Sequence, residues 1–62
     1  MKLKIKSYFG ELVDLTVNKE YEITHNFQDN DFGIEDDVGF WFITRVDSPC
    51  EFLNGGFWEI VE

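Results

Sequence analysis

Met1-Lys2-Leu3-Lys4-Ile5-Lys6 opens the chain with a strict alternation of apolar and basic residues. Successive side chains of a β-strand point to opposite faces, so the three apolar residues share one face and the three lysines the other. The stretch therefore predicts a half-buried strand over residues 1–6 with its lysines in water. Lysines at these positions would also protect a sheet edge from pairing with another chain.

The rest of the chain continues in short stretches of strand-like sequence. Residues 20–24, Glu-Tyr-Glu-Ile-Thr, alternate again, with the apolar side chains expected to point inward. Residues 40–46, Phe-Trp-Phe-Ile-Thr-Arg-Val, begin apolar on both faces, which predicts a central strand with packing on each side. Further strands are expected over 32–35 and 57–61, and residues 50–53 fit either a strand stub or a single helical turn.

Residues typical of turns separate these stretches. They lie at 10–14, 18–19, 28–31, 36–39, 47–49 and 54–56. No window keeps the helical period. We therefore expect one all-β domain over residues 1–62, built as a small five-stranded barrel or as a strongly bent antiparallel sheet.

The composition limits how such a small domain is stabilised. Cys50 is the only cysteine and His25 the only histidine, so an internal disulfide is excluded and a zinc site of cysteine and histidine lacks its ligands. Seven Phe, two Trp and two Tyr instead supply much buried area from few residues. A lone cysteine suits a reducing compartment, and no apolar run approaches membrane-spanning length. We expect a soluble cytoplasmic protein with no membrane partner.

The charge of the chain restricts the class of partner. Thirteen acidic residues stand against five basic ones, a formal net charge of -8. Residues 1–10 hold three lysines and no acid, so the acids all lie in the remainder and the charge is predicted to be two-sided. An acidic surface repels nucleic acid and attracts basic surfaces. We expect no direct binding of nucleic acid and favour a basic surface on a protein.

One run of the sequence concentrates the acids. Five carboxylates fall between residues 29 and 37, namely Asp29, Asp31, Glu35, Asp36 and Asp37. Presented together by two neighbouring loops, they would form a negative patch that imitates the phosphates of DNA, which lie about 3.4 Å apart along each strand. The alternative is that these acids serve turn formation and solubility, because Asp side chains hydrogen-bond to the local backbone. Residues 29–33 also begin like a calcium-binding loop, but the glycine and the final acid are misplaced, so no metal is expected.

The two tryptophans are further candidates for a binding site. Trp41 and Trp58 each neighbour a phenylalanine that faces the opposite way in a strand. If both indoles are exposed together, they form an aromatic anchor of the kind enriched at interface hot spots. If both are buried, they close the ends of a small barrel. The predicted binding residues are therefore the five acids with Trp41 and Trp58.

Catalysis is not expected from this chain. Cys50 and His25 lie far apart in the sequence and no third group is indicated to orient them. Cys50 is predicted to be a small buried hydrophobe, and His25 a solvated polar residue at the end of a strand. A domain of this size also leaves little room for a closed cleft, so neither a catalytic residue nor a cofactor is predicted.

Three blocks of the chain form a recognisable pattern: Leu-Thr-Val-Asn-Lys-Glu-Tyr-Glu-Ile over 15–23, Ile-Glu-Asp-Asp-Val-Gly over 34–39 and Gly-Phe-Trp-Glu-Ile-Val over 56–61. The pattern resembles small phage and prophage proteins with an SH3-like β-barrel. It departs from them at Trp58, which adds an aromatic residue to the last block. The resemblance implies an SH3-like fold, the cytoplasm of a bacterial host and a partner among host proteins, and it implies no catalytic residue.

Two hypotheses of function follow. The first is a non-catalytic, acidic, phage-type binding protein that presents a negatively charged face to a basic surface of a host protein. In its most concrete version it is an inhibitor of a nucleic-acid-handling or defence protein and acts as a DNA mimic. The second is a structural or accessory subunit that self-associates as a homo-oligomer or completes a partner's sheet, with the N-terminal strand as the added strand.

Overall fold

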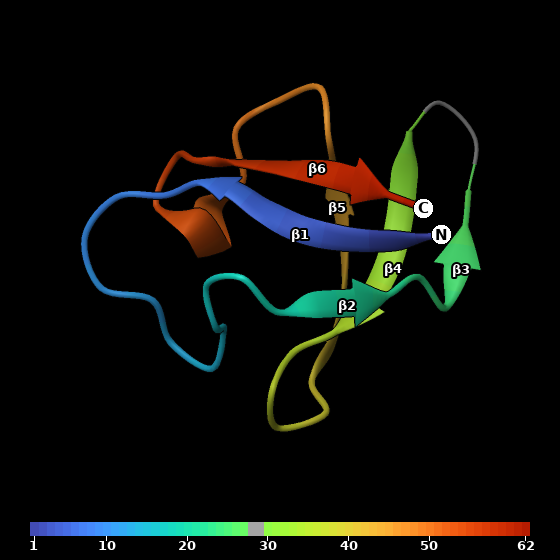
Figure 1. The fold of residues 1–62 in the computed structure, drawn as a ribbon, viewed down its shortest axis with the longest axis horizontal. Coiled ribbons are helices and arrows are strands. Elements are labelled where there is room, and N and C mark those ends of the chain that lie inside the picture. Colours follow the sequence, from blue (N-terminus) through green and yellow to red (C-terminus); the bar gives the residue numbers. More distant parts are fainter. Residues whose placement is uncertain (28–29) are drawn as a thin grey trace.

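The computed structural model describes residues 1–27 and 30–62, and this part of the chain is all-β, as predicted. Six strands form two three-stranded antiparallel sheets (Figure 1). The elements are β1 (Lys2–Ser7), β2 (Glu20–Glu22), β3 (His25–Asn26), β4 (Asp31–Glu35), β5 (Trp41–Arg45), the 3₁₀ turn η1 (Glu51–Leu53) and β6 (Phe57–Val61). Within the described residues, no helix has the length and apolar character needed to cross a membrane.

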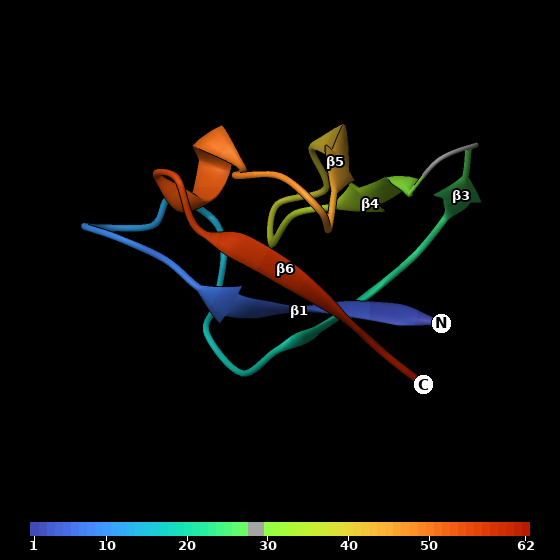
Figure 2. The ribbon, with the colours of Figure 1, turned by 90° about the horizontal axis from the view of Figure 1, so that it is seen from above.

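The two sheets pack in separate layers with their strands crossing. The first sheet has the order β2-β1-β6 and the second the order β3-β4-β5. In Figure 1 the strands of the first sheet run across the view while β4 and β5 run up and down it, and Figure 2 shows the two layers from above. Such orthogonal packing lets the inner faces of both sheets build one core. The strands belong to two sheets that do not close into the predicted five-stranded barrel.

Residues 20–26 carry the backbone from the first sheet to the second. β2 pairs with β1, which places Tyr21 opposite Leu3, and β3 pairs with β4. Between the two strands, the Ile23 amide donates to the Met1 carbonyl (3.4 Å) and the Thr24 amide donates to the Gly33 carbonyl (2.8 Å). The single strand predicted over 20–24 is therefore a bent segment that contributes to both sheets.

β1 is the central strand of the first sheet. Leu3 and Ile5 are buried and the lysines alternate with them, as the sequence pattern predicted. β1 pairs with β2 along one side and with β6 along the other, where Ile5 lies opposite Trp58. The expectation that these lysines protect a sheet edge is wrong, because both sides of β1 are hydrogen-bonded.

β5 lies at an edge of the second sheet, although residues 40–46 were predicted to form a central strand. Along β5, Phe42 and Thr44 are buried whereas Trp41 and Ile43 are exposed. No further layer of the described chain covers the outer face. The aromatic side chains on that face instead pack against one another across the sheet, which is why the strand is apolar on both sides without being central.

The core lies between the sheets and is dense in aromatic residues. The Tyr21 ring meets the Trp58 ring edge to face, with centroids 5.7 Å apart and planes at 87°. Cys50 is buried, as predicted for a small hydrophobe. Among the residues that the structure describes, ten apolar ones are buried: Leu3, Ile5, Leu15, Tyr21, Phe32, Ile34, Phe42, Cys50, Leu53 and Trp58.

Residues 50–56 form a tight corner before β6. Of the two predicted alternatives for residues 50–53, the single helical turn is confirmed as η1. Asn54 and Gly55 follow it with φ values of 57° and 99°, a left-handed conformation that glycine adopts readily. A Cβ atom on Gly56 would lie 2.0 Å from the Ser7 carbonyl oxygen. Glycine at position 56 therefore allows the chain to enter β6 directly beside the end of β1.

We predict that Gly56→Ala destabilises the protein at or beyond the upper end of the ~1–3 kcal/mol typical of overpacking, because the added Cβ meets backbone. Gly33→Ala is the matched control. Its Cβ meets the exposed Trp41 indole at 2.7 Å, and this ring can shift by giving up its hydrogen bond to Thr24, so we expect a smaller loss of stability. Thermal unfolding followed by circular dichroism compares the two variants. An equal loss of stability in both would contradict the backbone contact assigned to Gly56.

Candidate binding surface

The acids of the run 29–37 do not form one patch. Asp31 begins β4 and Glu35 ends it, and Asp36 and Asp37 lie in the following turn. Because a strand rises about 3.3 Å per residue, the two ends of β4 are roughly 13 Å apart. The first residue of β4 and the turn after β4 therefore lie at opposite ends of the strand (Figure 1). The predicted single patch is therefore wrong for the described acids, and Asp29 lies outside the described residues.

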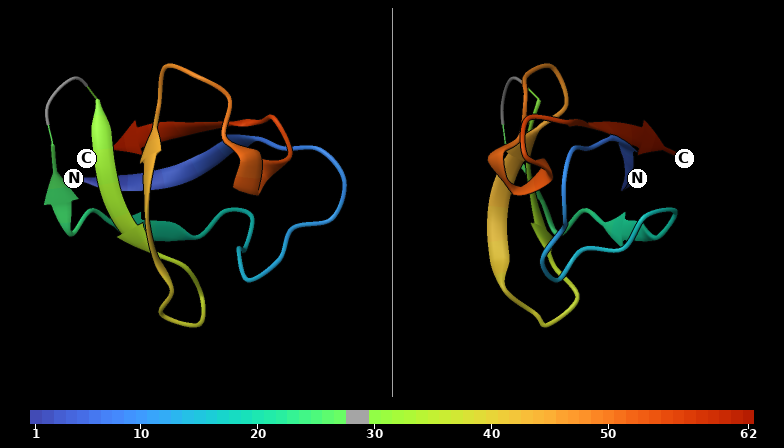
Figure 3. Two further views of the ribbon diagram at one scale, coloured as in Figure 1. Left: turned by 180° about the vertical axis from the view of Figure 1, so that it is seen from behind. Right: turned by 90° about the vertical axis from the view of Figure 1, so that its left-hand side faces the viewer.

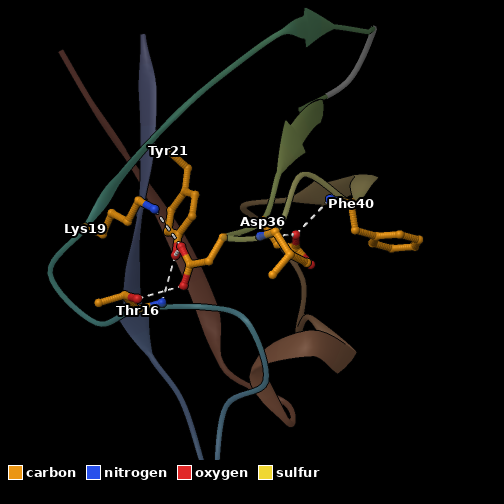
Figure 4. Close-up of polar contacts among 7 residues, drawn as sticks. Thr16, Lys19, Tyr21, Asp36 and Phe40 are labelled. Carbon is orange, nitrogen blue, oxygen red and sulfur yellow. Dashed lines mark hydrogen bonds and ion pairs between the residues drawn. The ribbon is translucent and has the colours of Figure 1, made fainter.

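The carboxylate of Asp37 is held by Thr16, Lys19 and Tyr21, three side chains from β2 and the segment before it, which lie close together in Figure 4. Its carboxylate accepts hydrogen bonds from Thr16 Oγ1 (2.7 Å), Lys19 Nζ (2.6 Å) and the Tyr21 hydroxyl (2.8 Å). The bond from Lys19, followed by those from Thr16 and Tyr21, lowers the pKa of Asp37 from 3.8 to about 2. Asp37 thus ties the β4–β5 turn to the chain before β2.

Tyr21 joins this network to the core. Its ring is buried, and its hydroxyl accepts a hydrogen bond from the Thr16 amide (2.7 Å) while it donates to Asp37. Burial raises the pKa of the Tyr21 hydroxyl. Lys19 Nζ lies 5.1 Å from the centroid of the same ring, within the range of a cation–π interaction. The Tyr21 side chain therefore contributes apolar packing in the core and hydrogen bonds at the surface.

Asp36 stabilises its own turn. Its Oδ1 accepts hydrogen bonds from the amides of Val38 (3.0 Å) and Phe40 (2.8 Å), and the Asp36 amide donates to the Phe40 carbonyl (2.9 Å). Figure 4 shows the contact between Asp36 and Phe40. This is the turn chemistry that was considered as the alternative to a binding role. For Asp36 and Asp37, the contacts support that alternative.

The other two described acids of the run differ in their surroundings. Asp31 lies 3.3 Å from Arg45 Nε, which also lies 3.2 Å from Asp47. A hydrogen bond from Asn30, aided by Arg45, lowers the pKa of Asp47. Glu35 is exposed and makes no ion pair or hydrogen bond to another described residue. It lies opposite Trp41 in the β4–β5 register, so its carboxylate is available beside an exposed indole.

The three N-terminal lysines do not form a separate basic face. Lys2 lies opposite Glu22, and Lys4 lies between Glu20 and Glu59 on the neighbouring strands. Lys2 Nζ is also 3.5 Å from Glu20. Opposite charges placed across strands in this way stabilise a sheet modestly. For Lys2 and Lys4 the predicted two-sided charge distribution is therefore wrong, because strand pairing places acids from elsewhere in the sequence beside them.

The two tryptophans have different positions. Trp58 is 1% exposed and belongs to the core, so it is not available as a surface anchor. Trp41 is 41% exposed, and its ring lies over Gly33, where no side chain competes for the space. Its Nε1 donates to Thr24 Oγ1 (3.0 Å), which fixes the ring orientation. The predicted anchor of two exposed tryptophans is reduced to Trp41 alone.

Trp41 belongs to an aromatic cluster that the sequence did not reveal. The ring centroids of His25 and Phe27 are 5.8 Å apart. The centroid of the Trp41 ring lies 5.6 Å from that of His25 and 6.4 Å from that of Phe27. Ile43, two residues after Trp41 on the same face of β5, is 51% exposed. His25 is thus exposed as predicted, but it stacks on Phe27. We call His25, Phe27, Trp41 and Ile43 the aromatic face.

Two shallow hollows border the aromatic face. One, of about 300 Å³, includes Thr24, which accepts the hydrogen bond from Trp41. The other residues that line it are Lys19, Glu20, Tyr21, Glu22, Glu35 and Asp36. The second hollow, of about 310 Å³, lies along residues 43–45 of β5 and is closed on its far side by residues 48–52. The aromatic face is therefore bordered by acidic side chains near Thr24 and by open space along β5.

The described residues bring together neither a metal-binding cluster nor the pair of Cys50 and His25. Among residues 1–27 and 30–62, no three His, Cys, Asp or Glu side chains are arranged to hold a metal ion. Cys50 is buried in the core, whereas His25 belongs to the aromatic face on the outside of the second sheet. The surface features that the geometry offers are an exposed aromatic cluster, its acidic border and a strand edge.

Comparison with protein-family models, with curated proteins and with solved structures finds no match to this chain. The resemblance to small phage proteins therefore depends on the three sequence blocks alone. The function has to be inferred from the surface of the protein.

We predict that the stability of the protein falls as the pH is lowered from about 4 to about 2, in part through Asp37. Its pKa is lower in the folded chain than in the unfolded chain, so its ionised form stabilises the fold above the unfolded value and that contribution is lost on protonation. Asp37→Asn should lower the thermal midpoint at pH 6 and flatten its dependence on pH in this range. Glu35→Gln, which removes an exposed carboxylate without such bonds, is the control. Equal pH slopes for Asp37→Asn and the unaltered protein would contradict this role.

Proposed function

We propose that this protein is a non-catalytic binding domain whose aromatic face recognises a basic region of another protein. The observation that carries the proposal is the position of Trp41, which is exposed, held over Gly33 and bonded to Thr24. An indole ordered before binding loses little conformational entropy when a partner covers it. Trp is also among the residues most enriched at interface hot spots.

The surroundings of Trp41 favour a cationic partner. Lys or Arg side chains bind well over the face of an indole and gain further from a nearby carboxylate. Glu35 lies opposite Trp41, and the hollow beside Thr24 adds Glu20 and Glu22. The net charge of -8 would speed the approach of a basic protein and repel nucleic acid.

The resemblance to phage proteins gives a narrower version of this proposal. In that version the fold is SH3-like, with residues 20–26 as the strand that bends between the sheets, and the partner is a host protein that handles nucleic acid or takes part in defence. The acids at the two ends of β4 give little support to a continuous row that imitates phosphates, because Asp36 and Asp37 are engaged within the fold. We therefore place the contact on the aromatic face with its acidic border.

The second hypothesis, a structural or accessory subunit, loses its simplest form. β1 is paired on both sides, so the N-terminal strand has no free edge to add to another sheet. β3 and β5 are the two edge strands of the second sheet, and both contribute residues to the aromatic face. Any completion of a sheet through this face would therefore involve the second sheet.

We predict that immobilised protein retains a basic partner from a bacterial lysate at low salt and loses it at high salt, because the acids attract through screened charge. With the retained partner purified, Trp41→Ala should weaken binding at least ~30-fold, the effect of a hot spot of about 2 kcal/mol. Glu35→Gln should mainly lower the association rate constant, because it removes a charge that attracts the basic partner. The dissociation constants and rates are measured by surface plasmon resonance.

Phe9→Ala is the matched control, since Phe9 is an exposed aromatic residue on the loop after β1. Its binding should equal that of the unaltered protein. The proposal fails if retention is insensitive to salt, or if the Trp41 and Phe9 variants bind alike. Thermal unfolding of each variant shows that it is folded.

A further inference from the structure

The hydrogen-bond pattern of the β4–β5 hairpin shows which backbone groups of β5 face outward. The Asp36 amide donates to the Phe40 carbonyl, so residues 36 and 40 form a hydrogen-bonded pair. In an antiparallel ladder such pairs alternate with non-bonded ones, which makes 34–42 and 32–44 the next bonded pairs. The amides and carbonyls of Trp41 and Ile43 therefore point away from β4, to the free side of β5.

The other side of β4 agrees with this assignment. There the carbonyl of Gly33 accepts from Thr24, and the carbonyl of Asp31 accepts from Phe27. The backbone N–H and C=O groups of odd-numbered residues in β4 thus point to β3, and those of even-numbered residues point to β5. Within the described chain, no backbone hydrogen bond outside the strand ladders involves Trp41 or Ile43.

Space for another strand lies beside these free groups. The hollow of about 310 Å³ runs along residues 43–45 and ends at residues 48–52. Figure 3 shows β3, β4 and β5 side by side, with the chain after β5 turning away towards η1. β5 also lacks lysine and proline, which commonly protect exposed edges.

We propose that an extended basic segment of a partner protein docks as an additional strand along the free side of β5. This inference rests on the proposed function and adds its mode of binding. Main-chain hydrogen bonds to Trp41 and Ile43 would give affinity, and alternate side chains would give specificity. On one face a Lys or Arg would reach the Trp41 indole and Glu35. On the other, a small aliphatic side chain would enter the hollow beside Thr44 and Phe52.

Charge complementarity selects such a partner over a second copy of this chain. Two copies would bring two surfaces of net charge -8 together. Their lysines Lys2 and Lys4 lie among acidic residues of their own chain, opposite Glu22, Glu20 and Glu59. A segment in which basic and aliphatic residues alternate meets both the acidic border and the hollow.

Amide hydrogen exchange followed by NMR tests the free edge without any ligand. The amides of Trp41 and Ile43 should exchange at least 100-fold faster than those of Phe42 and Thr44, which are bonded to β4. Equal protection at the four positions would overturn the inference. Protection of Trp41 and Ile43 that rises with protein concentration would also overturn it, because it would make a second copy the occupant.

The peptide Ac-Lys-Val-Lys-Val-Lys-Val-Lys-NH₂ then serves as the probe. It should slow exchange at Trp41 and Ile43, and the same peptide with every backbone nitrogen methylated should bind at least 10-fold more weakly. Ile43→Pro, which removes one outward amide at an edge where proline is tolerated, should have the same effect. Ile43→Thr also shortens this side chain of the aromatic face but keeps the amide, so it should weaken binding less than Ile43→Pro.

The outcomes separate this inference from the proposed function. If the methylated peptide binds equally well and still perturbs the Trp41 indole, strand addition is overturned and recognition by the aromatic face stands. If Ac-Glu-Val-Glu-Val-Glu-Val-Glu-NH₂ binds as tightly as the lysine peptide, the proposed preference for a basic partner fails. Absence of binding by the lysine peptide at millimolar concentration overturns the inference.

Discussion

The side chain of Tyr21 is the contact on which most of this small fold depends. Its ring packs against Trp58 in the core, and its hydroxyl lies between the Thr16 amide and the Asp37 carboxylate. A buried hydroxyl without partners would be costly, so the turn after β4 and the loop before β2 must both approach it. One residue of the first sheet thereby positions the hairpin of the second sheet.

This constraint separates the acidic residues into two groups. Asp36 and Asp37 are used to shape and anchor the β4–β5 turn, and their lone pairs are occupied by hydrogen bonds within the chain. Glu35 lines a shallow hollow at the surface together with Glu20 and Glu22, and its exposed side chain makes no ion pair with another described residue, so it is available to an external cation. The high acid content of the chain therefore reflects two separate demands, and only the second concerns a partner.

The second sheet explains how an aromatic cluster remains at the surface of so small a domain. The inner face of this sheet supplies Phe32, Ile34 and Phe42 to the core, and no other sheet of the described residues packs over the outer face. Gly33 leaves room for the Trp41 ring, which shields part of the sheet while one side of the indole stays exposed. The result is an ordered apolar surface next to a free strand edge.

The sequence by itself determined the all-β class, most strand positions, the burial of Leu3, Ile5 and Cys50, and the absence of a disulfide, because these follow from local alternation and composition. Only the tertiary structure decided which strands lie at edges, since pairing partners are distant in sequence and alternation is the same in central and edge strands. It separated Asp31 from Asp37 and buried Trp58 while exposing Trp41. It also assembled His25, Phe27 and Trp41 from separate strands and a loop. Such contacts depend on strand order and register, which are set by packing of the whole core.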